Sequence, residues 1–337
     1  MKYYNIIDIP IEIYGLSCKG ENGNFWRLPY PIVDEISEPT KMLGRRNVGG
    51  RVRFQTNSNS IHIKMTLKTL DVDVAIPLWG SAGADVYEGI GVDSKYIGFV
   101  APDNYNDKKC EKIINKSPGI QQITINMPRN EHLQELIIGI DNDAEIFKPI
   151  PYTYEIPILY YGSSITEGGC SSRPGNCYTS MLSRWLDIDY MNLGFSGSAK
   201  GEKIVAEFIS KQNISIFMFD YDHNAPDATH LEMTHENFYQ IIRKANHDLP
   251  IVIMTRPDFA WDPIENYKRR EVIRSTYDKA IASGDKNVYF IDGENFYSNY
   301  GNPMLNACSI DGCHPNDLGF LCMTKTLYPI MLEILKA

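Results

Sequence analysis

The pattern of apolar residues changes near residue 155, and this change constrains the fold more than any other feature of the chain. Before it, short apolar or alternating runs are separated by turn-forming stretches such as residues 19–24 and 103–107, and we find no amphipathic helix. This pattern is typical of an all-β sandwich. The segment 51–65 is expected to form a hairpin. The runs expected to form strands are 25–29, 51–57, 60–68, 73–79, 96–102, 121–128 and 133–141.

After residue 155, strand-like runs alternate with helical stretches. In residues 200–212, the apolar side chains Ile204, Val205, Phe208 and Ile209 recur on one helix face. Strands that alternate with helices predict a parallel sheet covered on both faces, with its ligand at the carboxyl ends of the strands. We therefore predict a jelly-roll-like β-sandwich domain over residues 1–153 and an α/β domain over 154–337. The five expected parallel strands are 156–162, 188–194, 214–220, 250–255 and 287–292.

Composition excludes several classes of partner. The chain has 337 residues and a formal net charge of -9, which repels phosphate backbones, so we expect no nucleic acid partner. We find no apolar stretch that approaches a membrane span and no signal peptide pattern, so we expect no membrane partner and a cytoplasmic location. The seven cysteines form no paired CxxC motifs, and a reducing compartment suits them.

The segments that follow the first two parallel strands carry small and hydroxyl residues. GSSIT, residues 162–166, places a serine at a sharp exit from a strand, where a helix start can offer N–H groups to an oxyanion. Ser164 is the candidate nucleophile, although Ser163 or Ser164 also fits a helix N-cap. After the second strand, Gly197 in NLGFSGS could offer its N–H to an oxyanion, and the same glycine-rich loop also fits an ordinary turn.

The segment after the third strand is DYDHNAP, residues 220–226. Asn224 could supply a neutral side-chain donor to developing negative charge. A metal cluster of His223, His230 and His235 is an alternative, but the last two are expected on the exposed face of a helix. An EF-hand is excluded, because Ala225 stands where the loop needs glycine.

The segment before the last helix is DGCHPN, residues 311–316. Asp311 and His314, three residues apart, let one turn hold a carboxylate against an imidazole, with His314 taking the serine proton and Asp311 fixing its tautomer. The two residues also fit an ordinary turn. Cys313 suggests a cysteine nucleophile or a metal ligand, but we see no second ligand pair for it. Four strand exits thus supply Ser, Gly, Asn and Asp with His, which favours one catalytic site over coincidence.

These segments resemble the four blocks of the SGNH (GDSL) hydrolase superfamily. The blocks match Ser164, Gly197, Asn224, and Asp311 with His314. The chain also resembles a two-domain subgroup of SGNH-type esterases, whose N-terminal G-x-D-L-Y motif is similar to GADVY at residues 83–87. The resemblance implies a flavodoxin-like three-layer α/β/α domain and ester hydrolysis without a metal or cofactor. Ser163 stands where the superfamily has aspartate, and Asp222 and Ala225 differ from its third block.

The resemblance also implies a carbohydrate or small-molecule ester as substrate, with an acetyl group as the expected acyl group. Backbone N–H groups of Ser164 and Gly197, with the Asn224 side chain, would form the oxyanion hole. Arg173, in residues 170–175, could bind a substrate carboxylate or hydroxyl, or could pair with a surface carboxylate. A lysophospholipase or thioesterase and a non-catalytic carbohydrate-binding protein remain alternatives.

Overall fold

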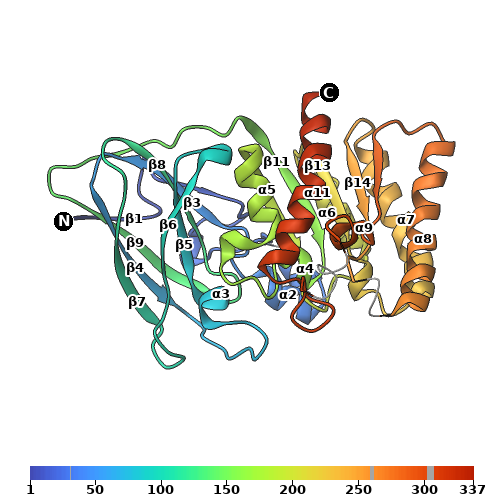
Figure 1. Cartoon of the computed structure of the whole chain (residues 1–337), viewed down its shortest axis with the longest axis horizontal. Coiled ribbons are helices and arrows are strands. Elements are labelled where there is room, and N and C mark those ends of the chain that lie inside the picture. Colours follow the sequence, from blue (N-terminus) through green and yellow to red (C-terminus); the bar gives the residue numbers. More distant parts are fainter. Residues whose placement is uncertain (31, 259–261, 302–306) are drawn as a thin grey trace. The chain divides into compact units, whose positions relative to one another are not determined.

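The computed structural model describes residues 1–30, 32–258, 262–301 and 307–337. Contacts divide the chain into two compact units (Figure 1). Unit 1 holds residues 1–29, 44–155 and 170–191, and unit 2 holds residues 30–43, 156–169 and 192–337. The domain boundary at residues 153 and 154 stays a prediction.

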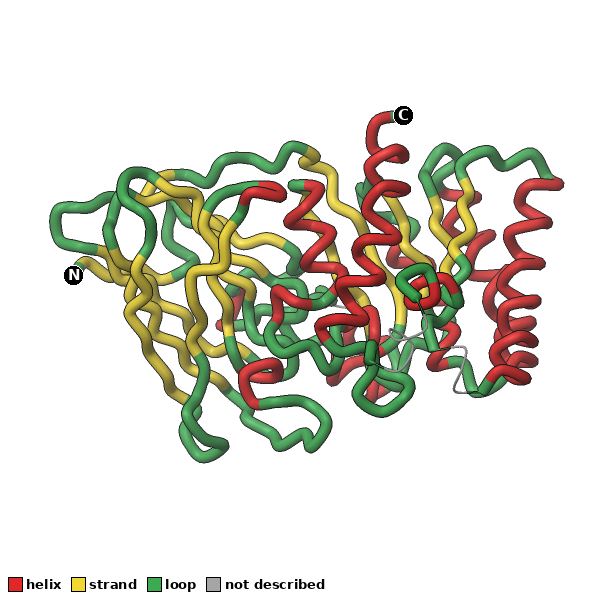
Figure 2. Tube along the Cα trace, viewed as in Figure 1, coloured by secondary structure: helices red, strands yellow, loops and turns green. Residues whose placement is uncertain are grey.

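Unit 1 is built on two antiparallel sheets, as the alternating runs predict (Figure 2). Alternate side chains of both sheets form one apolar core that includes Val52, Phe54, Ile63 and Ile125. In sheet order, the first sheet contains β1 (Lys2–Asn5), β9 (Leu133–Ile140), β4 (Ser60–Leu67) and β7 (Lys109–Asn115). The second contains β10 (Ile146–Phe147), β3 (Arg51–Thr56), β8 (Gln121–Asn126), β5 (Ala84–Glu88) and β6 (Lys95–Val100), with β2 (Glu12–Tyr14) paired to β3.

The predicted hairpin over residues 51–65 is wrong. Strands β3 and β4 form as expected, but β3 pairs with β8 and β4 pairs with β7 and β9, in the other sheet. The turn between them crosses the sandwich, and Asp141 holds it by accepting hydrogen bonds from the Ser58 hydroxyl (2.9 Å) and the Asn59 N–H (3.0 Å). The two strands therefore face each other across the core instead of lying side by side.

Two expected strands of unit 1 are also absent from the described residues. Residues 25–29 have no regular structure, and residues 73–79 run through a loop into α3 (Leu78–Ala82). Both runs contain a proline, which removes a donor that a strand would use. Unit 1 also contains α5 (Tyr178–Leu186) and the short 3₁₀ helices η1 (Glu21–Gly23), η2 (Gly91–Asp93) and η3 (Pro174–Asn176).

Five parallel strands form the central sheet of the second half, and each matches a predicted run to within two residues at either end. Their order is β12-β11-β13-β14-β15, which is the flavodoxin-like order 2-1-3-4-5. The predicted α/β fold is confirmed. The strands are β11 (Tyr154–Gly162), β12 (Ile188–Gly194), β13 (Ile216–Asp220), β14 (Ile251–Met254) and β15 (Val288–Ile291).

Helices flank this sheet (Figure 2). The α7 helix packs on α6 and α8, and α9 packs on α11. The helices of unit 2 are α1 (Ile32–Glu35), α2 (Glu38–Gly44), α4 (Ser164–Glu167), α6 (Lys203–Ile209), the 3₁₀ helix η4 (Asp222–Asn224), α7 (Ala228–Ala245), α8 (Pro263–Ala282), α9 (Asn295–Ser298) and α11 (Asp317–Lys336).

The expectation that no stretch approaches a membrane span needs a correction at α11. Within the described part of the chain, this helix of 20 residues is long and apolar enough to cross a bilayer by length and composition alone. A core helix passes the same test. Phe320, Met323, Leu327 and Met331 of α11 are fully buried within the protein.

Candidate active site

Ser164 lies at the start of α4, directly after β11. Gly162 ends the strand where only glycine fits, because a Cβ there would lie 2.0 Å from the Thr166 hydroxyl oxygen and 2.3 Å from the Asp220 carbonyl oxygen. The Ser163 hydroxyl caps the helix by accepting the Ile165 N–H at 3.1 Å. The cap therefore uses Ser163 and leaves the half-buried Ser164 hydroxyl for another partner.

That partner is His314. The Ser164 Oγ lies 3.0 Å from Nε2 of His314, and Nδ1 of His314 lies 2.7 Å from Oδ2 of Asp311. The structure thus brings the three residues into one hydrogen-bonded chain, across 150 residues of sequence. In such a chain, an imidazole that donates its Nδ1 proton to a carboxylate leaves Nε2 free to accept a proton from the serine.

Asp311 also fixes the turn that carries His314. Its Oδ1 accepts the backbone N–H groups of Cys313 at 2.9 Å and of His314 at 2.7 Å. Burial alone would raise the pKa of the Asp311 carboxyl, but the hydrogen bonds from the His314 ring and from the two backbone N–H groups outweigh it and lower the pKa. One carboxylate therefore orients the imidazole and holds its own turn.

Gly197 lies in the exposed loop that follows β12. It has a positive φ of 67°, a conformation that L side chains rarely adopt. The two residues before Gly197 fix the loop: the Phe195 N–H donates to the Gly162 carbonyl at 2.8 Å and the Ser196 N–H to the buried Glu167 carboxylate at 3.1 Å. Neither the Gly197 N–H nor the Ser164 N–H has an acceptor among the described residues, so both are available to a ligand.

Asn224 ends η4, after β13. Its side-chain Oδ1 accepts the Ala199 N–H from the loop after β12, at 3.4 Å. Because the oxygen is used in this way, the amide nitrogen Nδ2 points elsewhere, and it has no acceptor in the described part of the chain. Asn224 thus presents a neutral donor, as the sequence analysis predicts for this position.

Arg269 of α8 holds the loop that carries Asn224. This buried guanidinium donates to the carbonyl oxygens of Asp222 (2.6 Å), Ala225 (2.9 Å) and Pro226 (3.1 Å). The sequence analysis missed this residue. A signal was present, since Asn266, Arg269, Ile273, Thr276 and Ala280 recur on one helix face, and an arginine in such a buried row needs several acceptors.

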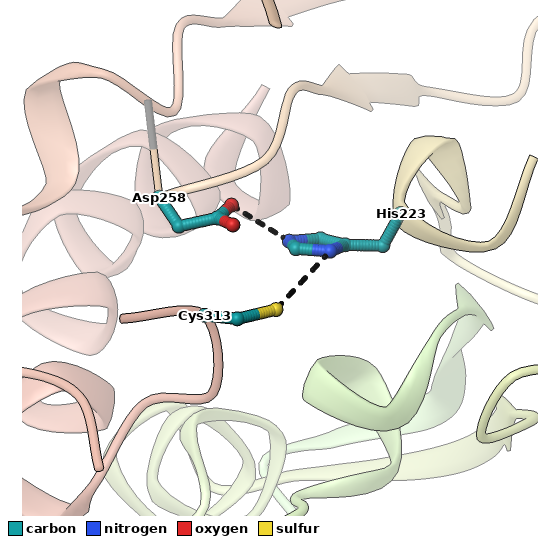
Figure 3. Close-up of side chains that lie close together, drawn as sticks. All are labelled: His223, Asp258 and Cys313. Atoms are coloured by element: carbon teal, nitrogen blue, oxygen red, sulfur yellow. Dashed lines mark hydrogen bonds and ion pairs between the residues drawn. The ribbon is translucent and has the colours of Figure 1, made fainter. Parts of the chain in front are cut away.

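A second cluster contains His223, Asp258 and Cys313 (Figure 3). His223 directly precedes Asn224 in the sequence, and Cys313 directly precedes His314. Nε2 of His223 lies 2.9 Å from Oδ1 of Asp258, and Nδ1 of His223 lies 3.7 Å from Sγ of Cys313. Arg256 binds both oxygens of Asp258, through Nε at 2.8 Å and Nη2 at 2.6 Å. Sequence reasoning considered His223 and Cys313 separately and missed Asp258.

A cysteine nucleophile at position 313 is not supported. Burial raises the pKa of the Cys313 thiol to about 12, and the nearby Asp258 carboxylate acts in the same direction. A thiol with so high a pKa is protonated near neutral pH and is a poor nucleophile.

The predicted position of His235 is wrong, and the three histidines considered as a metal cluster do not group together. His235 is buried and packs against Phe219 and Thr276, with ring centroids 4.4 Å from Phe219 and Nδ1 2.9 Å from the Thr276 hydroxyl. His230 lies 2.8 Å, through Nε2, from the Lys200 carbonyl oxygen. The helix α7 turns the face with Leu231, His235 and Phe238 inward, because that face carries most of its large apolar side chains.

Arg173 belongs to unit 1 and is held by its neighbours there. Its Nε and Nη2 donate to Oδ1 of Asn176 at 3.2 and 2.9 Å, its Nε lies 3.4 Å from the fully buried Asp85 carboxylate, and its guanidinium stacks on Tyr96 at 3.7 Å. Asp85 is the aspartate of the GADVY motif, and it also accepts the Gly175 N–H at 2.9 Å. The role of Arg173 in substrate binding stays a prediction.

A parallel sheet in the flavodoxin-like order, with a hydrogen-bonded serine and histidine beyond its strand ends, defines the class of SGNH-type ester hydrolases. A family model described as the GDSL-like lipase/acylhydrolase family matches residues 155–332, and a model described as the N-terminus of SGNH-hydrolase-type esterases matches residues 1–146. The chain belongs to the GDSL-like lipase/acylhydrolase family, and it is an ester hydrolase. The resemblance found in the sequence is confirmed.

Solved structures with this fold cover nearly the whole chain. A protein from Bacteroides ovatus described as a GDSL-like lipase is 27% identical, with a TM-score of 0.86 over 99% of this chain and 98% of that one. A salicylyl-acyltransferase, SsfX3, from a tetracycline biosynthetic pathway is 16% identical, with a TM-score of 0.80 over 99% and 97%. An acetyl xylan esterase, Est2A, from Butyrivibrio proteoclasticus is 14% identical, with a TM-score of 0.59 over 99% and 98%. No curated protein matches the chain.

Proposed function

We propose that this protein is a serine esterase that removes short acyl groups, acetyl above all, from a carbohydrate or another small alcohol. The observation that carries the proposal is the hydrogen-bonded chain from the Ser164 hydroxyl through the His314 ring to the Asp311 carboxylate. A structural role for these residues would not require a serine hydroxyl 3.0 Å from the free nitrogen of an imidazole that a carboxylate already orients.

In the proposed mechanism, His314 accepts the Ser164 proton at Nε2 while the serine oxygen bonds to the ester carbonyl carbon. The tetrahedral intermediate collapses when the carbon–oxygen bond to the alcohol breaks and His314 returns the proton to the leaving oxygen. Water then attacks the acyl-enzyme by the same route and releases the carboxylic acid. Throughout, Asp311 stabilises the imidazolium without accepting its proton.

The oxyanion of each tetrahedral intermediate would be stabilised by three donors: the backbone N–H groups of Ser164 and Gly197 and the side-chain amide of Asn224. All three groups lack an acceptor among the described residues. The Gly197 loop is fixed by hydrogen bonds to β11 and α4, and the Asn224 side chain is fixed by the Ala199 N–H. Such fixed donors need no reorganisation when charge develops, which is why each is worth roughly 3 kcal/mol of transition-state stabilisation.

The carbohydrate substrate is supported by similarity of fold. One neighbour is named an acetyl xylan esterase, and another is named a family two carbohydrate esterase from Clostridium thermocellum, in complex with cellohexaose. At 14% identity these neighbours share the fold, and we carry the substrate class over as part of the proposal. The cytoplasmic location is a separate part of the proposal, and the cysteine content, which suits a reducing compartment, supports it.

The test compares esters with purified full-length protein. We expect hydrolysis of p-nitrophenyl acetate by the wild type, loss of at least about a thousandfold in Ser164→Ala, and near-normal rates in Ser163→Ala apart from a loss of stability. Rates should fall as the acyl chain lengthens from acetate to laurate, and acetylated oligosaccharides should be deacetylated. A preference for laurate or for acyl thioesters would instead favour the lipid hydrolase, and no Ser164-dependent hydrolysis of any ester would favour a binding protein.

A further inference from the structure

The second sheet of unit 1 buries a polar face as well as an apolar one. In β3 the core residues Val52 and Phe54 alternate with Arg51 and Arg53, so the two arginines point away from the core. They are nevertheless only 2% and 1% exposed. Side chains of α5, which belongs to the same unit, line one cavity together with both arginines. Burial of two cations under this helix is costly unless each guanidinium has acceptors.

Arg51 has such acceptors. Its guanidinium donates to the Tyr152 hydroxyl at 3.1 Å and to the Tyr190 carbonyl oxygen at 3.2 Å. It also binds the Gly49 carbonyl oxygen and forms an ion pair with the Asp189 carboxylate. Groups of unit 1 therefore satisfy this arginine and neutralise its charge.

Arg53, two residues further along the same strand face, lacks such acceptors. Its Nε and Nη1 atoms are buried, and neither has a hydrogen-bond partner in the described part of the chain. Arg53 forms no ion pair with any described residue either. Its guanidinium stacks on the Tyr152 ring at 3.7 Å, but stacking uses the face of the guanidinium and leaves the N–H groups at its edge unbonded.

Two further donors line the cavity beside Arg53. Arg53 and Tyr87 lie opposite Thr124 of β8 from its two sides, so the three side chains share one row of the sheet face. The Tyr87 hydroxyl is buried and has no hydrogen-bond partner among the residues described. Arg184 of α5 lies over the Tyr87 ring at 4.2 Å and donates through Nη1 to the Gly175 carbonyl oxygen at 3.1 Å.

The carboxylates near the cavity are already hydrogen-bonded to other groups. Asp187 lines the cavity, and its Oδ2 accepts the Thr153 N–H at 3.0 Å and the Thr153 hydroxyl at 2.8 Å. Asp85, on the same sheet face, accepts the Asn126 side-chain amide at 2.8 Å and pairs with Arg173. The cavity thus has two arginines without an ion pair among the described residues and a single carboxylate. An anion from outside the chain would balance this charge.

The size of the cavity favours one class of anion. Its volume is about 30 Å³, and one water molecule needs roughly 10 to 15 Å³ of such space, so the cavity holds a group with about two oxygen atoms. A carboxylate has two oxygens in a plane, which suits guanidinium N–H groups, whereas a phosphate has four. Ile90, which is exposed, also lines the cavity. The cavity therefore reaches the surface, and the remainder of a ligand can extend into solvent.

We propose that Arg53, Arg184 and the Tyr87 hydroxyl bind the carboxylate of a small organic acid, in a site that the esterase mechanism does not use. Both guanidinium groups and the hydroxyl donate to its oxygens. Burial raises the pKa of the Tyr87 hydroxyl, which stays protonated and able to donate. The bound acid joins β3 to α5, because Arg53 lies on the strand and Arg184 on the helix. Binding should therefore stabilise the folded protein.

The test titrates acetate, as the simplest stable probe, into full-length protein by isothermal titration calorimetry at constant ionic strength. We expect the wild type to bind one acetate per chain, with at least about tenfold weaker binding in Arg53→Gln and several-fold weaker binding in Tyr87→Phe. Arg274→Gln, which removes an exposed arginine of α8, is the matched control and should bind as the wild type does. Absence of binding to the wild type, or equal binding to Arg53→Gln, would overturn the site.

Inorganic phosphate is the second probe and tests the class of anion. We expect it to bind more weakly than acetate, because its four oxygens exceed the space in the cavity. Phosphate that binds more tightly than acetate, and loses this affinity in Arg53→Gln, would overturn the choice of a carboxylate.

Thermal unfolding gives a readout that does not need the titration. Without acetate, Arg53→Met should be at least as stable as the wild type, because it removes a buried cation that has no acceptor, whereas Arg51→Met should be less stable, because it leaves Asp189 unpaired. Acetate should raise the Tm of the wild type but not of Arg53→Met. A loss of stability in Arg53→Met as large as in Arg51→Met would overturn the site. These measurements do not use esterase activity, so failure of the esterase proposal and failure of this site are distinguishable.

Discussion

At the scale of single residues, the site depends on neutral donors whose own hydrogen bonds fix their direction. Asn224 is the side chain among them, and its oxygen is already bonded to the Ala199 N–H. We expect Asn224→Ala to lower kcat by about a hundredfold or more, with little change in KM, because the lost hydrogen bond strengthens only in the transition state. Steady-state kinetics with p-nitrophenyl acetate measure both constants. Asn237→Ala, an exposed position on α7, is the control, and wild-type turnover in Asn224→Ala would refute the assignment.

The lowered pKa of Asp311 leads to a prediction about how activity depends on pH. Its folded-state pKa is lowered, so its contribution to stability is present above the unfolded pKa and is lost only as the pH falls through the folded value. The carboxylate therefore stays ionised across the working range. Asp311→Asn should lower kcat/KM by at least about a hundredfold, by a similar factor at every pH between about 5 and 8. A loss that disappears toward pH 5 would show that Asp311 titrates there, contrary to this account.

At the scale of elements, helix α8 positions the loop of residues 222–226, to which it is not joined in the sequence. Arg269 donates to three carbonyl oxygens of residues 222–226, and lysine can replace only part of this fork. We expect Arg269→Lys to lower kcat about tenfold with KM unchanged. If the effect acts through Asn224, Arg269→Lys should cost much less in the Asn224→Ala background, and a double-mutant cycle measures this coupling. Full additivity would show that Arg269 acts on stability alone.

The helix α7 carries a buried histidine that should make stability depend on pH. Burial lowers the pKa of His235 to about 3, so the folded state binds fewer protons than the unfolded state below about pH 6.5. The contribution is present above pH 6.5 and is lost as the pH falls. Between pH 7 and 5 the wild type should lose about 2 kcal/mol more of its free energy of unfolding than His235→Gln does. Urea unfolding at both values tests this, with His230→Gln as the control. Equal losses in the wild type and His235→Gln would contradict the burial of a neutral ring.

At the scale of the whole molecule, the periodicity of apolar residues predicted where the strands lie better than it predicted which strands pair. All five parallel strands formed where apolar runs predicted them, because a strand buried on both faces leaves an unmistakable run. The prediction of a hairpin over residues 51–65 was wrong because alternation of apolar residues specifies which face of a strand is buried but not which strand lies beside it. Asp141, which holds the crossing turn, lies more than 80 residues away in sequence.

The active site, too, contains residues that the sequence predicted and residues that it did not. The order of strand exits sufficed to place Ser164, Gly197, Asn224 and His314 at one edge of the sheet. Arg269 was missed because the row of residues on one face of α8 does not show which carbonyl oxygens its guanidinium contacts. Asp258 was missed because it lies in a loop, where no local pattern indicates its partners. His235 was misplaced because a histidine on an amphipathic helix was assigned to the polar face, whereas a partner such as the Thr276 hydroxyl makes burial acceptable.

The central claim is that Ser164 is the residue that becomes acylated. Intact-protein mass spectrometry after rapid acid quench of the enzyme with p-nitrophenyl acetate tests it most directly. We predict a mass increase of one acetyl group that peptide mapping places on Ser164 and that is absent in Ser164→Ala. An acetyl group trapped on another residue, or turnover that survives in Ser164→Ala, would contradict the account.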